Sequence, residues 1–221
     1  MTNENQYNNI EEKFLSLTND EEIYEAGLNW DVSTEAKNKM FLQLKEDLYI
    51  YKAFNNWINL RKDYIEKKFM EVKDFNFILK FIQDFRISHN IKYKKFLELE
   101  DNLSIKIYRH WDKIPIYILE KKFMALTNEE ALFWAGREWR LSNFIKNYKF
   151  LLLWSDIYKK FVCSENCIYL YGLTWNGLSN KNKNIIFLKM KDKEAINNAL
   201  LYWTGLTNKS KELQRKYLEN K

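Results

Sequence analysis

The chain has 221 residues, of which 46% are hydrophobic and 17% aromatic, which argues against a largely disordered chain. Five glycines and one proline are too few for the many turns of an all-β fold, so the composition favours an all-α protein. The formal net charge is +6, and most of the 36 basic residues are lysines, a bias that we attribute to an AT-rich genome rather than to a binding function.

The first nine residues (MTNENQYNN) are polar, and we expect them to form a tail before a single helical-repeat domain over residues 10–221. No run of eighteen apolar residues and no apolar signal core occur, so neither a membrane span nor a secretion signal is expected. Two cysteines, Cys163 and Cys167, are too few for a disulfide scaffold and suit a reducing compartment. The sequence therefore predicts a cytoplasmic protein without a membrane partner.

A pentapeptide, EKKFM, occurs twice, at residues 66–70 and 120–124, and its phenylalanine belongs to a longer series. The series recurs every 27 or 28 residues as far as Phe150, and we continue it with two tryptophans. An apolar residue lies three positions after every anchor, which indicates a true repeat. The eight anchors are Phe14, Phe41, Phe69, Phe96, Phe123, Phe150, Trp175 and Trp203.

The repeat also carries residues suited to helix starts, because short polar side chains accept hydrogen bonds from exposed N–H groups there. Candidate caps five residues after the anchor are Asn19, Glu46, Asp74, Asp101, Asn128, Ser155, Asn180 and Asn208. Candidates nineteen residues after it are Ser33, Ser88 and Ser142, with Pro115 at the same place in the fourth copy. Proline is tolerated in a first helical turn, so it also marks a helix start.

A second aromatic column lies 15 or 16 residues after the anchor, at Trp30, Trp57, Phe85, Trp111 and Trp139. Between the caps, apolar residues follow helical spacing, so each unit is predicted to be a pair of helices of roughly 10 to 12 residues joined by a short turn. Both aromatic columns are interpreted as core between helices.

Helices this short are marginal alone in water and must stack on neighbouring units. The sequence thus predicts an all-α fold, an α-solenoid of about eight helix-turn-helix repeats of roughly 27 residues. The pattern resembles HEAT repeats in being a compact helical pair, although its unit is shorter than the usual ~40 residues. A compact helical bundle of duplicated hairpins is the alternative fold.

Few residues suggest catalysis. His89 and His110 occupy no recurring position, and Cys163 and Cys167 lack the further ligands that a structural metal site needs. Acidic pairs such as Glu129 and Glu130 begin predicted helices, where they complement the helix dipole. Phosphate-binding loops, nucleophile elbows and zinc-binding helix motifs do not occur. We therefore expect no enzymatic activity, catalytic residue, cofactor or metal.

Charge is the most suggestive feature. The whole net charge lies in the divergent last repeats, residues 175–221, and a lysine precedes several anchors, where stacking would align it along one ridge. The candidate partner-binding residues at the basic end are Lys181, Lys183, Lys189, Lys191, Lys193, Lys209, Lys211, Arg215 and Lys216. Those of the lysine ladder are Lys68, Lys95, Lys122 and Lys149.

Three functions fit these observations. The leading one is a non-enzymatic adaptor, inhibitor or immunity-type protein, of bacterial or mobile-element origin, that binds a protein or a protein–nucleic acid complex through the solenoid surface and its basic end. The second is a helical-repeat protein that binds RNA or DNA directly, or inhibits a nucleic-acid-processing complex. The third, an enzyme such as a base-excision glycosylase, requires an acidic residue and exposed aromatics in one cleft.

Overall fold

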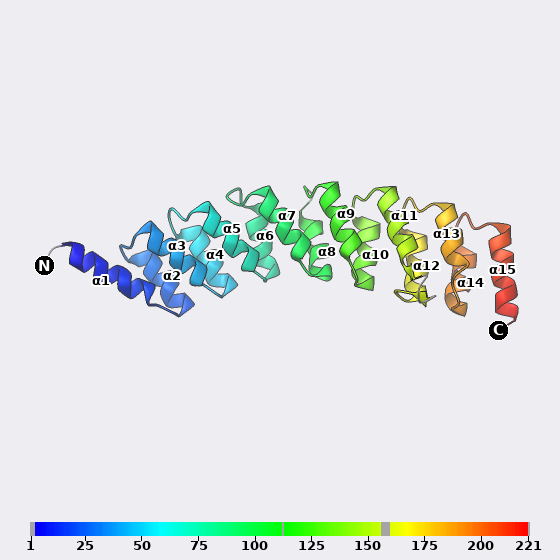
Figure 1. Cartoon of the computed structure of the whole chain (residues 1–221), viewed down its shortest axis with the longest axis horizontal. Coiled ribbons are helices and arrows are strands. Elements are labelled where there is room, and N and C mark those ends of the chain that lie inside the picture. Colours follow the sequence, from blue (N-terminus) through cyan, green and yellow to red (C-terminus); the bar gives the residue numbers. More distant parts are fainter. Residues whose placement is uncertain (1–2, 112, 156–159, 221) are drawn as a thin grey trace. The chain divides into compact units, whose positions relative to one another are not determined.

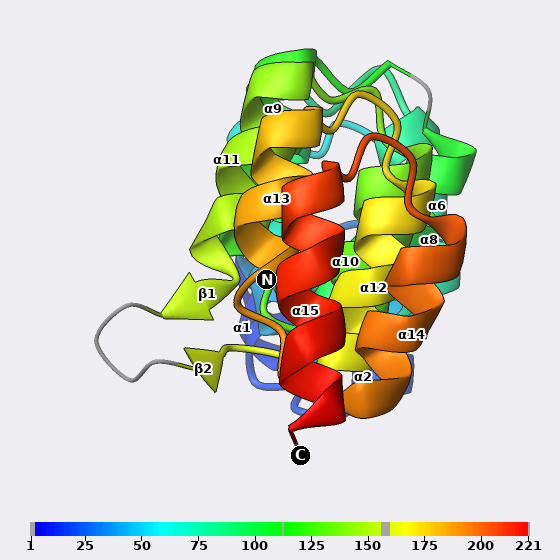
Figure 2. The same cartoon turned by 90° about the vertical axis from the view of Figure 1, so that its right-hand side faces the viewer.

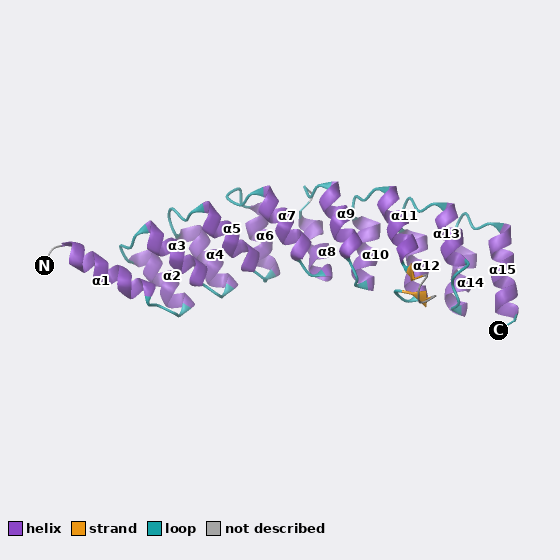
Figure 3. Cartoon of the chain, viewed as in Figure 1, coloured by secondary structure: helices purple, strands orange, loops and turns teal. Residues whose placement is uncertain are grey.

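The chain is all-α, as predicted. The computed structural model describes residues 3–111, 113–155 and 160–220, which hold fifteen helices and one short hairpin (Figure 3). The chain divides into two compact units, an N-terminal unit (Met1–Glu98) and a C-terminal unit (Leu99–Lys221).

Both units consist of short helices joined by short turns (Figure 1). The N-terminal unit contains α1 (Asn3–Leu15), α2 (Asp20–Asn29), α3 (Thr34–Gln43), α4 (Asp47–Asn56), α5 (Lys62–Glu71), α6 (Phe75–Gln83) and α7 (His89–Glu98). The C-terminal unit contains α8 (Asp101–His110), α9 (Ile116–Ala125), α10 (Glu129–Glu138), α11 (Asn143–Leu152), β1 (Trp154–Ser155), β2 (Lys160–Phe161), α12 (Glu165–Thr174), α13 (Asn180–Phe187), α14 (Lys193–Tyr202) and α15 (Asn208–Glu219).

Within each unit the helices form two rows. Odd-numbered helices pack on odd-numbered neighbours, as α3 does on α1 and α5, and even-numbered helices pack on even-numbered ones, as α12 does on α10 and α14. Figure 2 shows the two rows of the C-terminal unit end-on, with α9, α11 and α13 on one side, α10, α12 and α14 on the other, and α15 in front of both. Each unit is therefore a solenoid-like stack of helical pairs.

The anchor phenylalanines lie on the odd row and are fully buried from Phe14 to Phe150. Beyond Phe150 our continuation of the series was wrong, because the next fully buried anchor is Phe187 on α13. The antiparallel hairpin of β1 and β2, which pairs Trp154 with Phe161, lengthens this repeat: 37 residues separate Phe150 from Phe187, against 27 in the preceding unit. The insertion shifts the register of everything that follows it.

Trp175 and Trp203 instead belong to the second aromatic column. Both are buried and end even-numbered helices, as do Trp57 and Trp139. The prediction for the third repeat was also wrong, because Phe85 is 91% exposed. The next residue, Arg86, packs against the core in its place. The Arg86 guanidinium lies 3.6 Å from the centre of the Phe54 ring, donates to the Phe54 carbonyl at 2.8 Å and pairs with Asp84.

Five predicted caps are confirmed: the side chains of Asn19, Asp74 and Asn128 accept from N–H groups at the starts of α2, α6 and α10, and Ser33 and Ser142 do so at α3 and α11. Two predictions were wrong before the insertion, because Glu46 precedes α4 without a side-chain cap bond and Asp101 is the first helical residue of α8. The three caps predicted beyond Phe150 were also wrong, because the insertion changes the spacing there. Ser155 lies in β1, and Asn180 and Asn208 are first helical residues capped by Ser179 and Thr207. Residues 3–9, expected as a tail, belong to α1.

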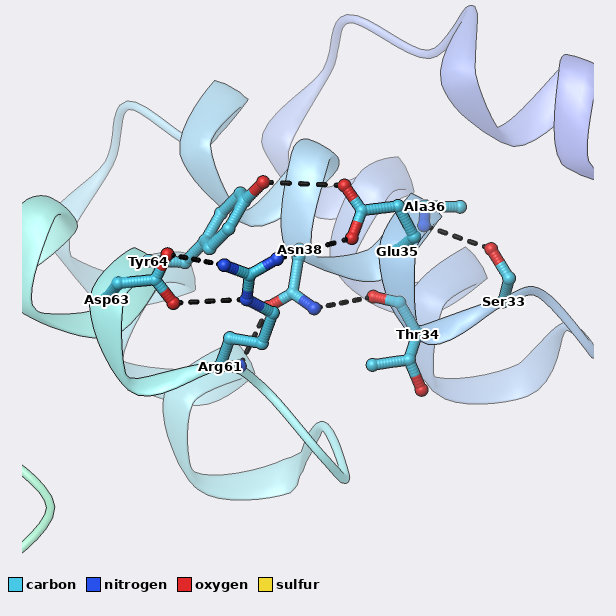
Figure 4. A network of polar contacts seen from close by, with 8 residues as sticks. All are labelled: Ser33, Thr34, Glu35, Ala36, Asn38, Arg61, Asp63 and Tyr64. Carbon is cyan, nitrogen blue, oxygen red and sulfur yellow. Dashed lines mark hydrogen bonds and ion pairs between the residues drawn. The ribbon is translucent and has the colours of Figure 1, made fainter.

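Polar side chains link successive repeats through the backbone. The residue three positions before the anchor has a side-chain oxygen that accepts a hydrogen bond from the backbone N–H just before the next odd-numbered helix. Glu66 accepts from the N–H of Ser88 at 2.8 Å, and Asn38 accepts from the N–H of Arg61 at 2.8 Å (Figure 4). Glu120 accepts from Ser142 in the C-terminal unit. These bonds satisfy N–H groups at helix starts and fix the register between repeats.

Candidate interaction surface

The lysine ladder exists, but its ammonium groups point inward. Lys68, Lys95 and Lys122 are at most 7% exposed, and Lys149 is half-buried. Each donates to carbonyls at the end of the preceding odd helix. Lys95 donates to the carbonyls of Met70 and Val72 at 2.7 and 2.6 Å. Lys149 donates to those of Met124 and Leu126 at 2.9 and 3.0 Å. Lys68 donates to the Leu42 carbonyl at 3.0 Å, and Lys122 donates to the Leu99 carbonyl.

These contacts give the ladder a structural role. The last carbonyls of a helix have no partner within that helix, and a lysine from the next repeat supplies one. Burial lowers the pKa of Lys95, Lys122 and Lys149, because removal from water disfavours the charged form. The ladder lysines therefore hold successive repeats together and are not free to form a basic ridge on the surface.

The basic residues of the chain end do not gather on one face. Lys181 is exposed on α13, whereas Lys183 on the same helix is half-buried, with its pKa lowered by burial. Lys189 lies 4.6 Å from the centre of the Trp154 ring. Lys193 begins α14 in the even row. Lys191 is exposed between α13 and α14, and Lys209, Lys211, Arg215 and Lys216 lie on α15, where Lys216 pairs with Glu212 at 2.7 Å.

The outer face of α3, α5 and α7 in the N-terminal unit is polar. Every exposed residue of α3, α5 and α7 is polar or charged. Figure 4 shows part of this face: the Arg61 guanidinium pairs with Asp63 at 2.8 Å and lies 3.9 Å from Glu35, whose carboxylate accepts from the Tyr64 hydroxyl. The polar side chains of this face pair with one another or with water and need no partner protein. Its exposed residues are Thr34, Glu35, Lys39, Gln43, Lys62, Asp63, Lys67, Glu71, His89, Asn90, Lys94 and Glu98.

The outer face of α9, α11 and α13 in the C-terminal unit is largely apolar. Six large apolar side chains of α9, α11 and α13 are between 36% and 74% exposed. No acidic residue of these three helices, all fully described, is exposed. We call this surface the α11 face. It consists of Ile116, Tyr117, Phe144, Tyr148, Leu152 and Ile185, with Lys121 and Lys181.

Repeat geometry brings these residues together. Phe144, Tyr148 and Leu152 are spaced by four residues and form one stripe about 12 Å long on α11. The rings of Phe144 and Tyr148 lie parallel, with an interplanar angle of 2° and centroids 6.2 Å apart. Lys121 on α9 and Lys181 on α13 flank the stripe, since both helices pack against α11. Among the described residues, no acidic side chain pairs with either lysine.

Sequence reasoning found Lys181 but missed the apolar part of this face, although a signal was present. The positions six and two residues before the anchor hold Asp63 and Lys67 on α5, but Phe144 and Tyr148 on α11. The candidate partner-binding residues predicted from the sequence were all basic. Hydropathy alone cannot separate these aromatics from the buried columns.

The cysteines and histidines have structural or exposed positions in the described part of the chain. Cys167 donates its thiol hydrogen to Glu129 at 3.0 Å, and burial raises the pKa of Cys163 to about 12. His89 and His110 are exposed at the start of α7 and the end of α8. Across residues 3–111, 113–155 and 160–220, no group of three or more His, Cys, Asp or Glu side chains could hold a metal ion.

The chain matches no protein-family model, no curated protein and no solved structure. In the part of the chain that is described, every helix is too short or too polar to cross a bilayer.

Proposed function

We propose that this chain is a non-enzymatic interaction protein that binds another protein through the α11 face. One observation carries the proposal: the positions six and two residues before the anchor are polar on α3, α5 and α7, whereas both are apolar on α11 and one of the two is apolar on α9 and on α13. An exposed cluster of aromatic and aliphatic side chains costs solubility and typically marks a contact surface.

The composition of the face favours a protein partner over a nucleic acid. Its centre is apolar, and only two exposed lysines border it, whereas nucleic-acid binding depends on many phosphate contacts. Phe144 and Tyr148 are large, rigid side chains that bury apolar area at a small cost in conformational entropy. Such residues commonly dominate the binding energy of an interface.

A capture experiment with matched baits tests this proposal. The wild-type chain, the double variant Phe144→Glu/Tyr148→Glu and the control Asn90→Glu/Lys94→Glu are immobilised and exposed to lysate of the native host. The control places the same charges at the equivalent positions of α7, where the face is already polar. We expect a protein retained by the wild type and the control to be lost with the Phe144/Tyr148 variant, and to bind the purified wild-type chain directly.

Circular dichroism and urea unfolding must show that the three baits are equally folded, because exposed substitutions should change stability by less than about 0.5 kcal/mol. If the Phe144/Tyr148 variant retains the same proteins as the wild type, the α11 face is not the binding surface and the proposal fails.

A further inference from the structure

We infer that the partner element seated on the α11 face is an amphipathic helix with acidic flanks. The inference rests on the proposed function and adds the kind of partner. Its basis is the shape of the exposed stripe together with the two lysines beside it.

The stripe has the geometry of a helix-packing ridge. Phe144, Tyr148 and Leu152 follow one another at i, i+4 and i+8, the row of side chains that one helix inserts between those of another. Ile116 and Tyr117 on α9 and Ile185 on α13 lie beside this row and widen the apolar area on both sides. A partner helix of about three turns, apolar at i, i+3, i+4 and i+7, covers a stripe of this length.

The two flanking lysines indicate which charge the partner helix carries beside its apolar stripe. Lys121 and Lys181 lie on opposite sides of α11, and the three helices expose no carboxylate to balance them. A helix that lies along α11 therefore meets a positive charge on each side of its apolar stripe. Acidic residues on both flanks of that helix complement the two lysines, and basic residues there are repelled.

This charge arrangement argues against a second copy of the chain as the occupant. A symmetric dimer through the α11 face sets the same surface against itself. Each copy contributes lysines and no exposed acidic residue from α9, α11 or α13, so the dimer offers these lysines no counter-charge. A helix from a different protein satisfies both the apolar stripe and the flanks.

Synthetic peptides with capped termini test the inference against the full chain. All share one apolar stripe of Leu and Ile at helical spacing, and the flanks are Glu in the first peptide and Lys in the second; a third has the composition of the first in scrambled order. We expect the Glu-flanked peptide to bind at least about tenfold more tightly than the other two, because like charges across an interface disfavour binding.

Charge exchange in the protein sharpens the test. The double variant Lys121→Glu/Lys181→Glu should lose affinity for the Glu-flanked peptide and gain it for the Lys-flanked one. Lys67→Glu is the matched control, since Lys67 and Lys121 occupy the same place in the two EKKFM segments, and it should change neither affinity. Phe144→Glu/Tyr148→Glu should abolish binding of both peptides.

Three results overturn the inference: no binding of the Glu-flanked peptide, equal binding of the Glu-flanked and scrambled peptides, or binding that Lys121→Glu/Lys181→Glu leaves unchanged. Dimerisation of the wild type that Phe144→Glu/Tyr148→Glu abolishes, seen by sedimentation, overturns it in favour of a second copy. Binding of a labelled oligothymidylate that depends on Lys121 overturns it in favour of a nucleic acid. Failure of the peptides alongside Phe144-dependent capture of a lysate protein leaves the proposed function standing.

Discussion

The two EKKFM segments, one in each unit, share their buried positions and differ in their outward-facing surroundings. In both, the phenylalanine (Phe69 or Phe123) is fully buried and the lysine before it (Lys68 or Lys122) donates to a carbonyl of the preceding repeat. Their surroundings differ on the outer face, where Asp63 precedes Lys67 by four residues on α5 and Tyr117 precedes Lys121 by four on α9. The scaffold columns are held in common, and the outward positions diverge.

This difference separates two kinds of substitution. Changes in the scaffold columns should destabilise either unit by similar amounts, because the same contacts recur in both. Changes on the outer face should leave stability almost unaltered and should alter binding only in the C-terminal unit.

The largest expected effect comes from filling a glycine contact. A methyl group added at Gly27 would lie 2.2 Å from the Trp57 ring, and one at Gly136 would lie 2.1 Å from the Trp175 ring. Helix propensity alone predicts that Gly→Ala stabilises each helix by up to about 1 kcal/mol. Because both rings are rigid and buried, we expect Gly27→Ala and Gly136→Ala each to destabilise the protein by about 3 kcal/mol instead.

Urea unfolding monitored by far-UV circular dichroism measures the effect. A stabilising change at either position would mean that the tryptophan ring moves aside freely. A large loss at one position and none at the other would break the equivalence of the scaffold in the two units.

The next effect concerns the lysine ladder. Lys95→Met and Lys149→Met keep much of the aliphatic packing and remove the bonds to two carbonyls. Hydrogen bonds to charged groups contribute roughly 1.5 to 3 kcal/mol each, offset by the cost of burying the charge. We expect a loss of about 2 kcal/mol for Lys95 and about 1 kcal/mol for Lys149, whose bonds are longer and more exposed.

The lysine variants also have a pH signature with a definite sign. Burial lowers the folded-state pKa of Lys95 below its ordinary value of 10.5, so the unfolded chain binds more protons in the window below 10.5. The wild type should therefore gain stability relative to Lys95→Met as pH rises through that window. If Lys149→Met lost partner binding without losing stability, the ladder lysines would have to contribute to the binding surface.

The sequence allowed the scaffold to be predicted because burial imposes strict spacing. Phe14 to Phe150 had to recur at one period, since each is a buried residue of an odd helix, and several pack against aromatic rings of the even row, as Phe41 does on Trp57 and Phe150 does on Trp175. The prediction failed at Trp175, because an insertion between Phe150 and Phe187 changed the period and both columns hold aromatic residues. A fixed spacing carried across an insertion assigns residues to the wrong column.

The functional surface was harder to predict for a different reason. Whether Lys122 points outward or inward depends on carbonyls of the preceding repeat, which no local pattern of charge reveals. Phe144 and Tyr148 have the hydropathy of core residues, and only the register relative to Phe150 places them outside. Aligning the repeats by anchor and comparing the outward positions would have found the α11 face without coordinates.

A smaller effect is expected at the cysteines near the hairpin insertion, which has no counterpart in the N-terminal unit. Thiolates, not thiols, react with alkylating agents, and burial raises the pKa of Cys163 to about 12. At about pH 8 we expect iodoacetamide to modify Cys163 more than about tenfold more slowly in the folded protein than in urea, because each pKa unit reduces the thiolate tenfold. Mass spectrometry of the digested protein checks this, and equal rates would mean that the thiol is accessible and ionised.

The smallest effect is expected where the units solve one turn differently. Two residues after a column tryptophan, Asn59 has φ 64°, while Gly177 and Gly205 in the C-terminal unit have φ 87° and 81°. Asparagine tolerates the left-handed region, and glycine would relieve its residual strain while adding freedom to the unfolded chain, so Asn59→Gly should change stability by less than about 0.5 kcal/mol.

The reverse exchange is not equivalent, because a Cβ at Gly177 would lie 1.8 Å from Oδ1 of Asn143, the first residue of α11. The residue at that place in α3 is the shorter Thr34, so urea unfolding should show Gly177→Asn to be clearly destabilising while Asn59→Gly is neutral. Equal effects at the two positions would mean that backbone conformation alone, and not the side chain facing the turn, decides which residue each unit accepts.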